Sequence, residues 1–444
     1  MKKIGMALCT LGVSLLATGC FQDAKENEDP TLKVMFGSEQ SFYRLYGDTF
    51  AAKFPNLDVE IVVPESSAWA NVKDYSRFVE TERPDLLILN PSDYDFLASN
   101  KLLLDLSTHI KRSGFDLDSI SPVVVTYLKS ATNDVGLYGL TRSFTSNVLV
   151  YNKELFERYG LAEPTGSMSW EQLYKLMDHF NRTALAGERI YGYEALNNMH
   201  PFHFVQTIAS SGGLSFVHVE TRQVTLNTTG WRNAIQLVTD AISSGALGGK
   251  RAQEGARNYM TEANLFARGK AALKDGNFQT VSEWINNPPP FRWGITGAVA
   301  YNPSEEATAS LFSSDEIFAI SAKADHKENA WRVIQYLNSD ELARAESGMR
   351  NGMLPARQDY APEIAGHDVG LFYRIASPGP SVKRDPLFDY LALPEAFTKV
   401  MASIILEEFD SVLDGKSTVE EALERMQLRE QAALDEAVVE ESKR

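Results

Sequence analysis

The sequence predicts an α/β protein with two lobes joined by a hinge. Short strand-like runs alternate with stretches that have the spacing of amphipathic helices, which is typical of a doubly wound α/β lobe. The alternation begins near Thr31 and starts again after about residue 150. Between the two halves, residues 135–153 (VGLYGLTRSFTSNVLVYNK) join two strand-like runs through small polar residues. The second run, at 148–151, is continuously apolar, which predicts a strand buried on both faces. We interpret this bridge as the point where the chain leaves one lobe and enters the other, with polar side chains facing a ligand.

The first 19 residues have the pattern of an export signal. Two lysines precede an apolar run at 4–17, and small residues follow it. The run is shorter than the about 20 residues that a membrane-spanning helix needs. The remaining chain has the length of about two domains. The formal net charge of −16 argues against a nucleic-acid partner, which requires basic surfaces.

The residues LLATGC at 15–20 look like a lipobox, in which the cysteine after the cleavage site becomes the lipidated first residue. We therefore expect Cys20 to carry lipid and residues 20–30 to form a flexible tether. The alternative is a plain signal peptide with an incidental cysteine. With Cys9 removed and Cys20 lipidated, no thiol is left for a disulfide, a metal or a nucleophile.

The first lobe is predicted to begin with a strand at 31–36, followed by a helix with apolar residues from Phe42 to Phe54. A second strand is expected at 57–63. The run LLIL at 86–89 is typical of a central parallel strand. Ligands of such sheets bind beyond the carboxyl ends of the strands, where this chain has GSEQ after the first strand and NPSD after the later one.

Helix boundaries in the second half are marked by capping signals. Ser169 and Gln172 fit a capping box at the start of one helix, and Trp231 begins another directly after a glycine. Residues 271–274 are expected to form a strand that runs into a small-residue turn at 275–278. Two C-terminal helices are expected. The first runs from Pro394 towards Gly415, and the second opens with a capping box at 417–420.

Two later segments resemble the first bridge in composition. Residues 311–321 (LFSSDEIFAIS) combine small polar residues with a strand and predict a crossing back to the first lobe. The residues NGMLP at 351–355 are a candidate third crossing. The resulting prediction places hinges near 145–147, 312–315 and 351–355, the first lobe at 31–144 plus 316–350, and the second lobe at 148–311 plus 356–444.

The stretch GLYGLTRSFTSNVLVYNKELFERYGL, with SWEQL soon after it, resembles the sugar-binding proteins of bacterial ABC importers, the maltose-binding-like group of extracellular solute-binding proteins. The resemblance covers nearly the whole mature chain. It implies a type II periplasmic-binding-protein-like fold whose lobes close on a carbohydrate, with an oligosaccharide expected. It also implies a monomer that is lipid-anchored at the outer face of the cell membrane, or on the periplasmic side if the cell has two membranes. The closed form would be offered to the permease subunits of the importer.

A sugar site needs planar polar side chains for the hydroxyls and an aromatic ring for the apolar face. The resemblance suggests contacts from the first lobe, the hinge and the second lobe, in that order: Glu39, Asn90, Ser92, Asp93, Arg142, Ser143, Thr145, Ser146, Asp275 and Phe278. Phe278 falls where the family often has a tryptophan. Trp69, Phe388 and Tyr390 are further candidate aromatic walls. For each polar position the alternative is a solvated loop residue or a helix cap.

Arg142 has two interpretations. Its guanidinium could bind an acidic substrate such as a uronate through a bidentate contact. It could equally pair with Asp93 across the cleft and steady the closed form, and this structural role is favoured slightly.

Other chemistries have little support. His200 and His203 could share a helix face, but no third metal ligand stands at a telling distance. Asp93 and Asp95 would form a glycosidase pair only if they shared a face, as residues two apart do on a strand. The sequence has no phosphate loop, nucleophile elbow or HExxH motif. We expect no enzyme activity, metal or cofactor. The alternatives are a binder of a non-sugar solute and, less favoured, a surface enzyme that degrades polysaccharide.

Overall fold

A computed structural model of the protein describes residues 31–64, 72–132, 136–183, 188–194, 200–247, 250–251, 259–260, 264–300, 314, 316–347, 352–364, 366–374 and 393–443. The predicted signal segment, the tether with Cys20, and the aromatic candidates Trp69, Phe388 and Tyr390 lie outside these residues. Across the described ranges, no helix is both long enough and apolar enough to cross a membrane.

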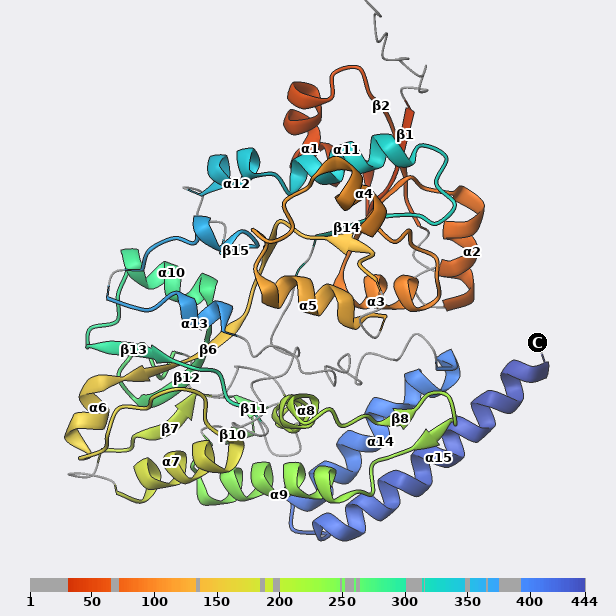
Figure 1. Ribbon diagram of the computed structural model, residues 1–444. Coiled ribbons are helices and arrows are strands. Elements are labelled where there is room, and N and C mark those ends of the chain that lie inside the picture. Colours follow the sequence, from red (N-terminus) through yellow and green to blue (C-terminus); the bar gives the residue numbers. More distant parts are fainter. Residues whose placement is uncertain are drawn as a thin grey trace, which may run out of the picture.

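The first lobe is built on a five-stranded sheet with the order β2-β1-β3-β14-β4 (Figure 1). Its strands are β1 (Thr31–Met35), β2 (Asp58–Val62), β3 (Leu86–Leu89), β4 (Gly139–Leu140) and β14 (Ile317–Ile320). β1 is parallel to β2 and β3, whereas β14 is antiparallel to β3 and β4. β3 lies inside the sheet, as the apolar run at 86–89 predicted. Strand β14 comes from a distant part of the sequence, so the chain returns to this lobe after it has built the second.

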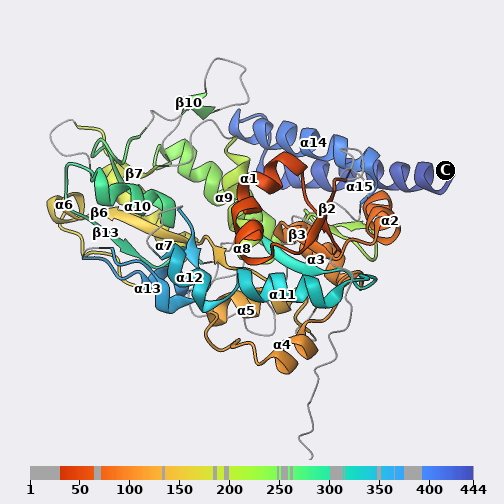
Figure 2. The ribbon, with the colours of Figure 1, turned by 90° about the horizontal axis from the view of Figure 1, so that it is seen from above.

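Helices flank this sheet (Figure 2, seen from above). They are α1 (Glu39–Lys53), α2 (Val72–Glu82), α3 (Pro91–Ser99), α4 (Ser107–Ser113), α5 (Pro122–Ser130), α11 (Lys327–Leu337) and α12 (Asp340–Glu346). The predicted helix that contains Phe42 is α1, and it buries Phe42, Tyr46 and Phe50 at helical spacing. The side chain of Ser38 caps α1 by accepting a hydrogen bond from the Ser41 amide at 3.2 Å.

The second lobe contains a four-stranded sheet with the order β13-β6-β12-β7. Its strands are β6 (Asn147–Asn152), β7 (Tyr191–Glu194), β12 (Ala271–Asn277) and β13 (Trp293–Thr296). The sequence predicted a strand at 271–274 and a turn from Asp275, but β12 continues to Asn277. It continues because β6 supplies antiparallel partners as far as Asn147. Two small hairpins complete the strands: β8 (Val217–His218) with β9 (Gln223–Val224), and β10 (Lys250–Arg251) with β11 (Tyr259–Met260).

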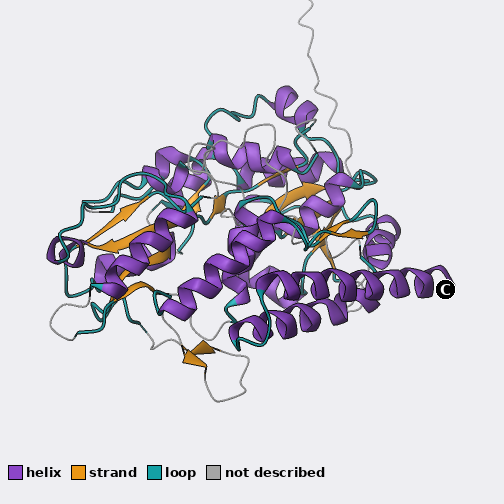
Figure 3. Ribbon diagram, turned by 90° about the horizontal axis from the view of Figure 1, so that it is seen from below, coloured by secondary structure: helices purple, strands orange, loops and turns teal. Residues whose placement is uncertain are grey.

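The helices of the second half are α6 (Lys153–Arg158), α7 (Trp170–Arg182), α8 (Phe202–Ser211), α9 (Thr229–Ser244), α10 (Phe278–Asn286), α13 (Gly370–Tyr373), α14 (Glu395–Leu413) and α15 (Val419–Lys443). The last two pack against each other and against α9 (Figure 3). The capping box predicted for α7 is confirmed, with Ser169 and Gln172 bonding each other reciprocally. The box that opens α15 lies one residue later than predicted, because Thr418 rather than Ser417 exchanges both bonds with a glutamate three residues on, Glu421.

Strand β6 is buried on both faces, as its continuous apolar run predicted. Leu149 and Tyr151 face one apolar cluster that α7, α8, α9, α14 and α15 complete. Val148 and Val150 face the other way, into a cluster that continues through Phe144 into the core of the first lobe. The two lobes are therefore joined by apolar contacts as well as by the chain itself.

Candidate functional site

Three segments that link the two sheets lie side by side. β5 (Ser143–Phe144) pairs antiparallel with β15 (Leu354–Pro355). The amide of Ala356 donates to the carbonyl of Arg142 at 2.8 Å. From the third segment, the hydroxyl of Ser314 donates to the carbonyl of Ser143 at 2.9 Å. The chain thus crosses between the lobes in one narrow strip. The lobe boundaries proposed from the sequence stay predictions, and residues 312, 313 and 351 lie outside the described ranges.

Hydroxyl groups in this strip satisfy backbone carbonyls. Thr141 Oγ1 lies 2.8 Å from Ser314 Oγ and donates to the carbonyl of Ser143. Ser146 is fully buried, and its hydroxyl donates to the carbonyl of Phe372 at 2.7 Å. These small polar residues replace the ladder bonds that are lost where the sheets end. Thr141 and Ser146 therefore have structural roles in this arrangement.

Thr145 differs from its neighbours. Its Oγ1 is buried and has no hydrogen-bond partner among the described residues. A buried hydroxyl without a partner is costly unless water or a ligand bonds it. Among the predicted hinge contacts, Thr145 thus has a buried hydroxyl that is available to water or a ligand.

Arg142 is held inside the first lobe by two carboxylates. Its Nε donates to Glu316 at 2.9 Å and its Nη1 to Glu346 at 2.6 Å. The guanidinium carbon lies 5.8 Å from the ring centroid of Tyr46, whose hydroxyl donates to Glu316 at 2.7 Å. Burial raises the pKa of Glu346, and Arg142 opposes that rise. The proposed pairing with Asp93 is wrong: the ion pairs that Arg142 makes in this structure are with these two glutamates.

Asn90 and Asp93 bond each other at the start of α3. Asn90 Oδ1 accepts from the Asp93 amide at 2.9 Å, so Asn90 is the N-cap of the helix, and its Nδ2 donates to Asp93 Oδ2 at 2.8 Å. Asp93 is only 6% exposed. Burial raises the pKa of Asp93 to about 6, while the bond from Asn90 acts in the opposite direction. Ser92 is half-buried beside this pair, and Glu39 is exposed in the first turn of α1.

Asp275 and Phe278 lie at the hinge end of the second sheet. Asp275 is half-buried in β12 opposite Leu149, burial raises its pKa, and the hydroxyl of Tyr193 hydrogen-bonds its carboxylate. Phe278 is 2% exposed, and its ring packs edge-on against Phe372 at a centroid distance of 5.8 Å. In this conformation the ring predicted to stack on a sugar belongs to the core.

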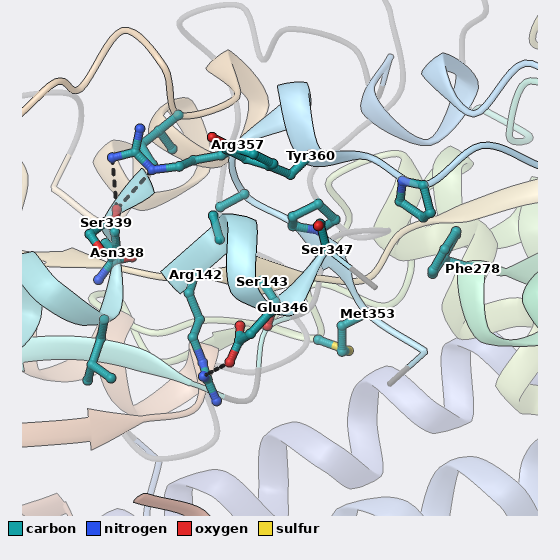
Figure 4. A pocket seen from close by; sticks show the side chains of 16 residues that line it. Arg142, Ser143, Phe278, Asn338, Ser339, Glu346, Ser347, Met353, Arg357 and Tyr360 are labelled. Carbon is teal, nitrogen blue, oxygen red and sulfur yellow. Dashed lines mark hydrogen bonds and ion pairs between the residues drawn. The ribbon is translucent and has the colours of Figure 1, made fainter. Parts of the chain in front are cut away.

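A cavity beside the hinge brings three predicted residues together: Arg142, Ser143 and Phe278 (Figure 4). The end of α11, helix α12 and the segment after β15 form its other walls. Its volume is about 50 Å³. A space of this size holds a few water molecules in this conformation. The other seven predicted contact residues do not line it. The cavity therefore lies at the hinge and brings together only part of the predicted set of contacts.

Residues that the sequence interpretation missed include the partners of Arg142. Glu316 stands in the segment recognised as the second crossing, but nothing local pairs it with Arg142. Asn147 was also missed. It lies opposite Asn277 in the register of β6 and β12, hence on the same face as Asp275.

The described residues do not have the arrangement that a metal site or a hydrolase would need. His200 Nε2 lies 3.1 Å from a carboxylate oxygen of Asp410, and its Nδ1 accepts from the Phe202 amide. The described residues contain no group of three His, Cys, Asp or Glu side chains placed to hold a metal. Asp93 and Asp95 both lie on helix α3, where residues two apart do not share a face.

Comparison with known proteins identifies the family. The family model described as bacterial extracellular solute-binding protein matches residues 36–344. A protein of Brucella abortus (strain 2308) named as a candidate binding protein is 25% identical over 248 residues, which make up 54% of this chain and 55% of that protein. The chain thus spans about half the length of the curated relatives it matches.

Solved structures share the fold. UspC of M. tuberculosis has a TM-score of 0.62 at 17% identity and covers 91% of this chain and 100% of its own. The sugar-binding protein MalE of Xanthomonas citri has a TM-score of 0.60 at 17% identity and covers 93% and 100%. A sugar transporter of Rhizobium etli in an open conformation has a TM-score of 0.56 at 17% identity and covers 90% and 99%. The predicted two-lobed type II fold is confirmed, and the chain belongs to the family of bacterial extracellular solute-binding proteins.

Proposed function

We propose that the protein captures a carbohydrate between its lobes and delivers it to the permease of an ABC importer. The observation that carries this proposal is the hinge: the linking segments meet in one strip at Ser143, Ser314 and Ala356. Because so little chain joins the lobes, rotation about this strip can open and close the space between them. Hinge closure of this kind is how two-lobed binding proteins enclose a ligand.

The polar groups near the strip suit a ligand rich in hydroxyls. Asp93 and Asp275 are partly satisfied carboxylates with lone pairs to spare, and the hydroxyl of Thr145 has no partner among the described residues. Such acceptors and donors hold sugar hydroxyls, while hydrolysis would need a placed acid/base pair, for which Asp93 and Asp95 lack the geometry. Two solved structures with this fold contain maltose, from T. maritima, and D-mannitol, from Agrobacterium vitis. They support a sugar or polyol as the ligand class.

In this proposal the protein does no chemistry on its ligand. Transport energy comes from the ATPase subunits of the importer, and the protein presents the closed form to the permease. Lipid on Cys20 would hold the monomer at the outer face of the cell membrane, with residues 21–30 as its tether. A binder of a non-sugar solute is the alternative within the same fold.

The test is calorimetric titration of the purified protein with mono- and oligosaccharides and polyols, with chromatography of the recovered ligand. We expect saturable heat from at least one carbohydrate, which is recovered intact. A thermal-shift screen can select the candidates, because a ligand at 100 times its Kd adds about 2.7 kcal/mol to stability. Shortened products would show an enzyme, and a response to non-sugar solutes alone would exclude a carbohydrate carrier.

A further inference from the structure

We propose that the cleft accepts uncharged sugars and rejects their acidic counterparts, because the protein neutralises the one cation predicted to face the ligand. The inference rests on the proposed carbohydrate function and specifies its substrate class. Among the ten residues predicted to contact the ligand, Arg142 is the only positively charged one. A uronate would therefore depend on Arg142 for its carboxylate.

The guanidinium of Arg142 is already occupied. Recognition of a carboxylate by arginine uses two parallel N–H bonds from one edge of the fork. Here Nε bonds Glu316 and Nη1 bonds Glu346, and Figure 4 shows the bond to Glu346. Each of the two edges that could bind a carboxylate, Nε/Nη2 and Nη1/Nη2, therefore already has one nitrogen engaged by a glutamate. The Arg142 side chain is only 21% exposed. A ligand carboxylate would have to displace one of these glutamates, which would then be left partly buried without its partner.

The charge of this cluster also opposes an anion. One guanidinium faces two carboxylates, so the formal charge of Arg142, Glu316 and Glu346 together is negative. Tyr46 donates a hydrogen bond to Glu316, which strengthens the hold on that carboxylate without adding positive charge. An anionic ligand near the hinge thus meets net repulsion, in addition to the loss of its own hydration.

The charged residues predicted to contact the ligand beyond the hinge are also negative. Asp93 and Asp275 can accept hydrogen bonds from sugar hydroxyls, but they repel a carboxylate. Lys274 adjoins Asp275 in β12, and strand neighbours point to opposite faces. Its Nζ lies 5.9 Å from the ring centroid of Trp284. This lysine therefore lies on the opposite face from Asp275, although its charge acts against the burial that raises the pKa of Asp275.

Uncharged polar groups near the hinge also favour a ligand with hydroxyls over one with a charge. Thr145 has a buried hydroxyl with no partner in the described part of the chain. Asn147 shares its sheet face with Asp275 and lies at the hinge end of β6. A hydroxyl and an amide can each both donate and accept, which matches sugar hydroxyls and leaves a ligand charge uncompensated.

The test is titration of the purified protein at about pH 7.5, where uronates are ionised, with matched pairs. The pairs are glucose and glucuronate, galactose and galacturonate, and glucitol and gluconate. We expect the neutral member of a bound pair to bind at least about tenfold more tightly. Equal or tighter binding of the acidic members would overturn the inference and leave carbohydrate binding intact. No heat with any member, or with the wider carbohydrate panel, would instead reject the proposed function.

The variant Glu346→Gln tests the cause. It leaves Arg142 with one carboxylate and removes one negative charge, so the affinity for the acidic member relative to the neutral member should rise roughly fivefold. Glu341→Gln is the matched control, since it makes the same charge change on α12 at an exposed residue that pairs with Lys53. Equal ratios for the two variants would show that neutralisation of Arg142 is not responsible.

Salt dependence of the unmodified protein provides a measurement that needs no variant. Raising the salt from about 20 mM to about 300 mM shortens the Debye length from roughly 20 Å to below about 8 Å. We expect the preference for the neutral member to narrow as the repulsion is screened. A preference that does not change with salt would mean that shape, and not charge, excludes the acidic sugar.

Discussion

Glu430 is a buried carboxylic acid that has no hydrogen-bond partner in the described part of the chain, and it dominates the pH dependence that we expect for the C-terminal helix pair. The side chain is 1% exposed, and neither carboxylate oxygen has a partner among the described residues. Burial raises the pKa of Glu430 from its ordinary value of 4.5 to about 8, with Arg429 acting against that rise. Arg429 and Arg425 are both drawn to Glu408 on α14, at 2.6 and 2.7 Å. They do not form hydrogen bonds with Glu430.

The direction of the effect follows from linkage. The folded state holds the Glu430 proton more tightly than the unfolded state, so the stabilisation is complete below about pH 4.5. It is lost as the pH rises towards about 8. One pKa unit corresponds to about 1.4 kcal/mol, and by pH 7 the loss has grown to roughly 3 kcal/mol. At neutral pH this residue therefore costs the protein stability.

Glu430→Met removes the titrating group and keeps an apolar side chain of similar length in the buried stripe of α15. We expect the variant to exceed the wild type in free energy of unfolding by roughly 3 kcal/mol at about pH 7 and by much less at about pH 5. The assay is urea unfolding across that pH range, followed by circular dichroism. Glu424→Gln is the control, because this glutamate is exposed on the same helix. Parallel stability curves for wild type and Glu430→Met across the pH range would refute the reasoning.

Three further predictions concern the hinge and the cleft. Arg142→Met leaves Glu316 and Glu346 without their cation and should lower the free energy of unfolding by about 3 kcal/mol in urea titrations, with little change in affinity for a neutral sugar. A loss of affinity larger than about tenfold would make Arg142 a ligand contact. Phe278→Ala empties a site that is 2% exposed and should cost about 3–4 kcal/mol in thermal unfolding, with weaker sugar binding in titration calorimetry. An unchanged Kd would remove Phe278 from the site. Because burial raises the pKa of Asp93 to about 6, its carboxylate is protonated below that pH, and sugar affinity should fall between about pH 7.5 and 5. In calorimetry, the sugar affinity of Asp93→Asn should change less with pH than that of the wild type. An equally steep change would assign the pH effect to another group.

Local patterns in the sequence predicted much of the fold. The apolar run at 86–89 identified β3, and the run at 148–151 identified β6, because a strand buried on both faces has no polar alternation. The capping box at Ser169 depends only on residues three apart and is confirmed in α7. The capping box predicted at 417–420 was one residue too early, since Thr418 pairs with Glu421. Tertiary contacts with the preceding helix decided its position, since Ser417 bonds Ser411 of α14.

The candidate site was less predictable for the same reason. Asp275 was expected after a strand and lies within one, because the length of β12 depends on a partner strand more than 100 residues away. Asn90 and Asp93 were named as ligand contacts. In the structure these two side chains form hydrogen bonds with each other. A set of contacts inferred from a family resemblance does not show such a pairing.

The amino-acid sequence alone determined that this protein has two α/β lobes and a polar bridge between them, because strand and helix periodicities and turn chemistry depend on neighbours along the chain. Only the tertiary structure decided that Arg142 is neutralised by Glu316 and Glu346, that the Phe278 ring belongs to the core, and that Glu430 is buried away from any partner in the described ranges. Those outcomes depend on which distant side chains approach within a few ångströms, and on how much water the fold excludes around them.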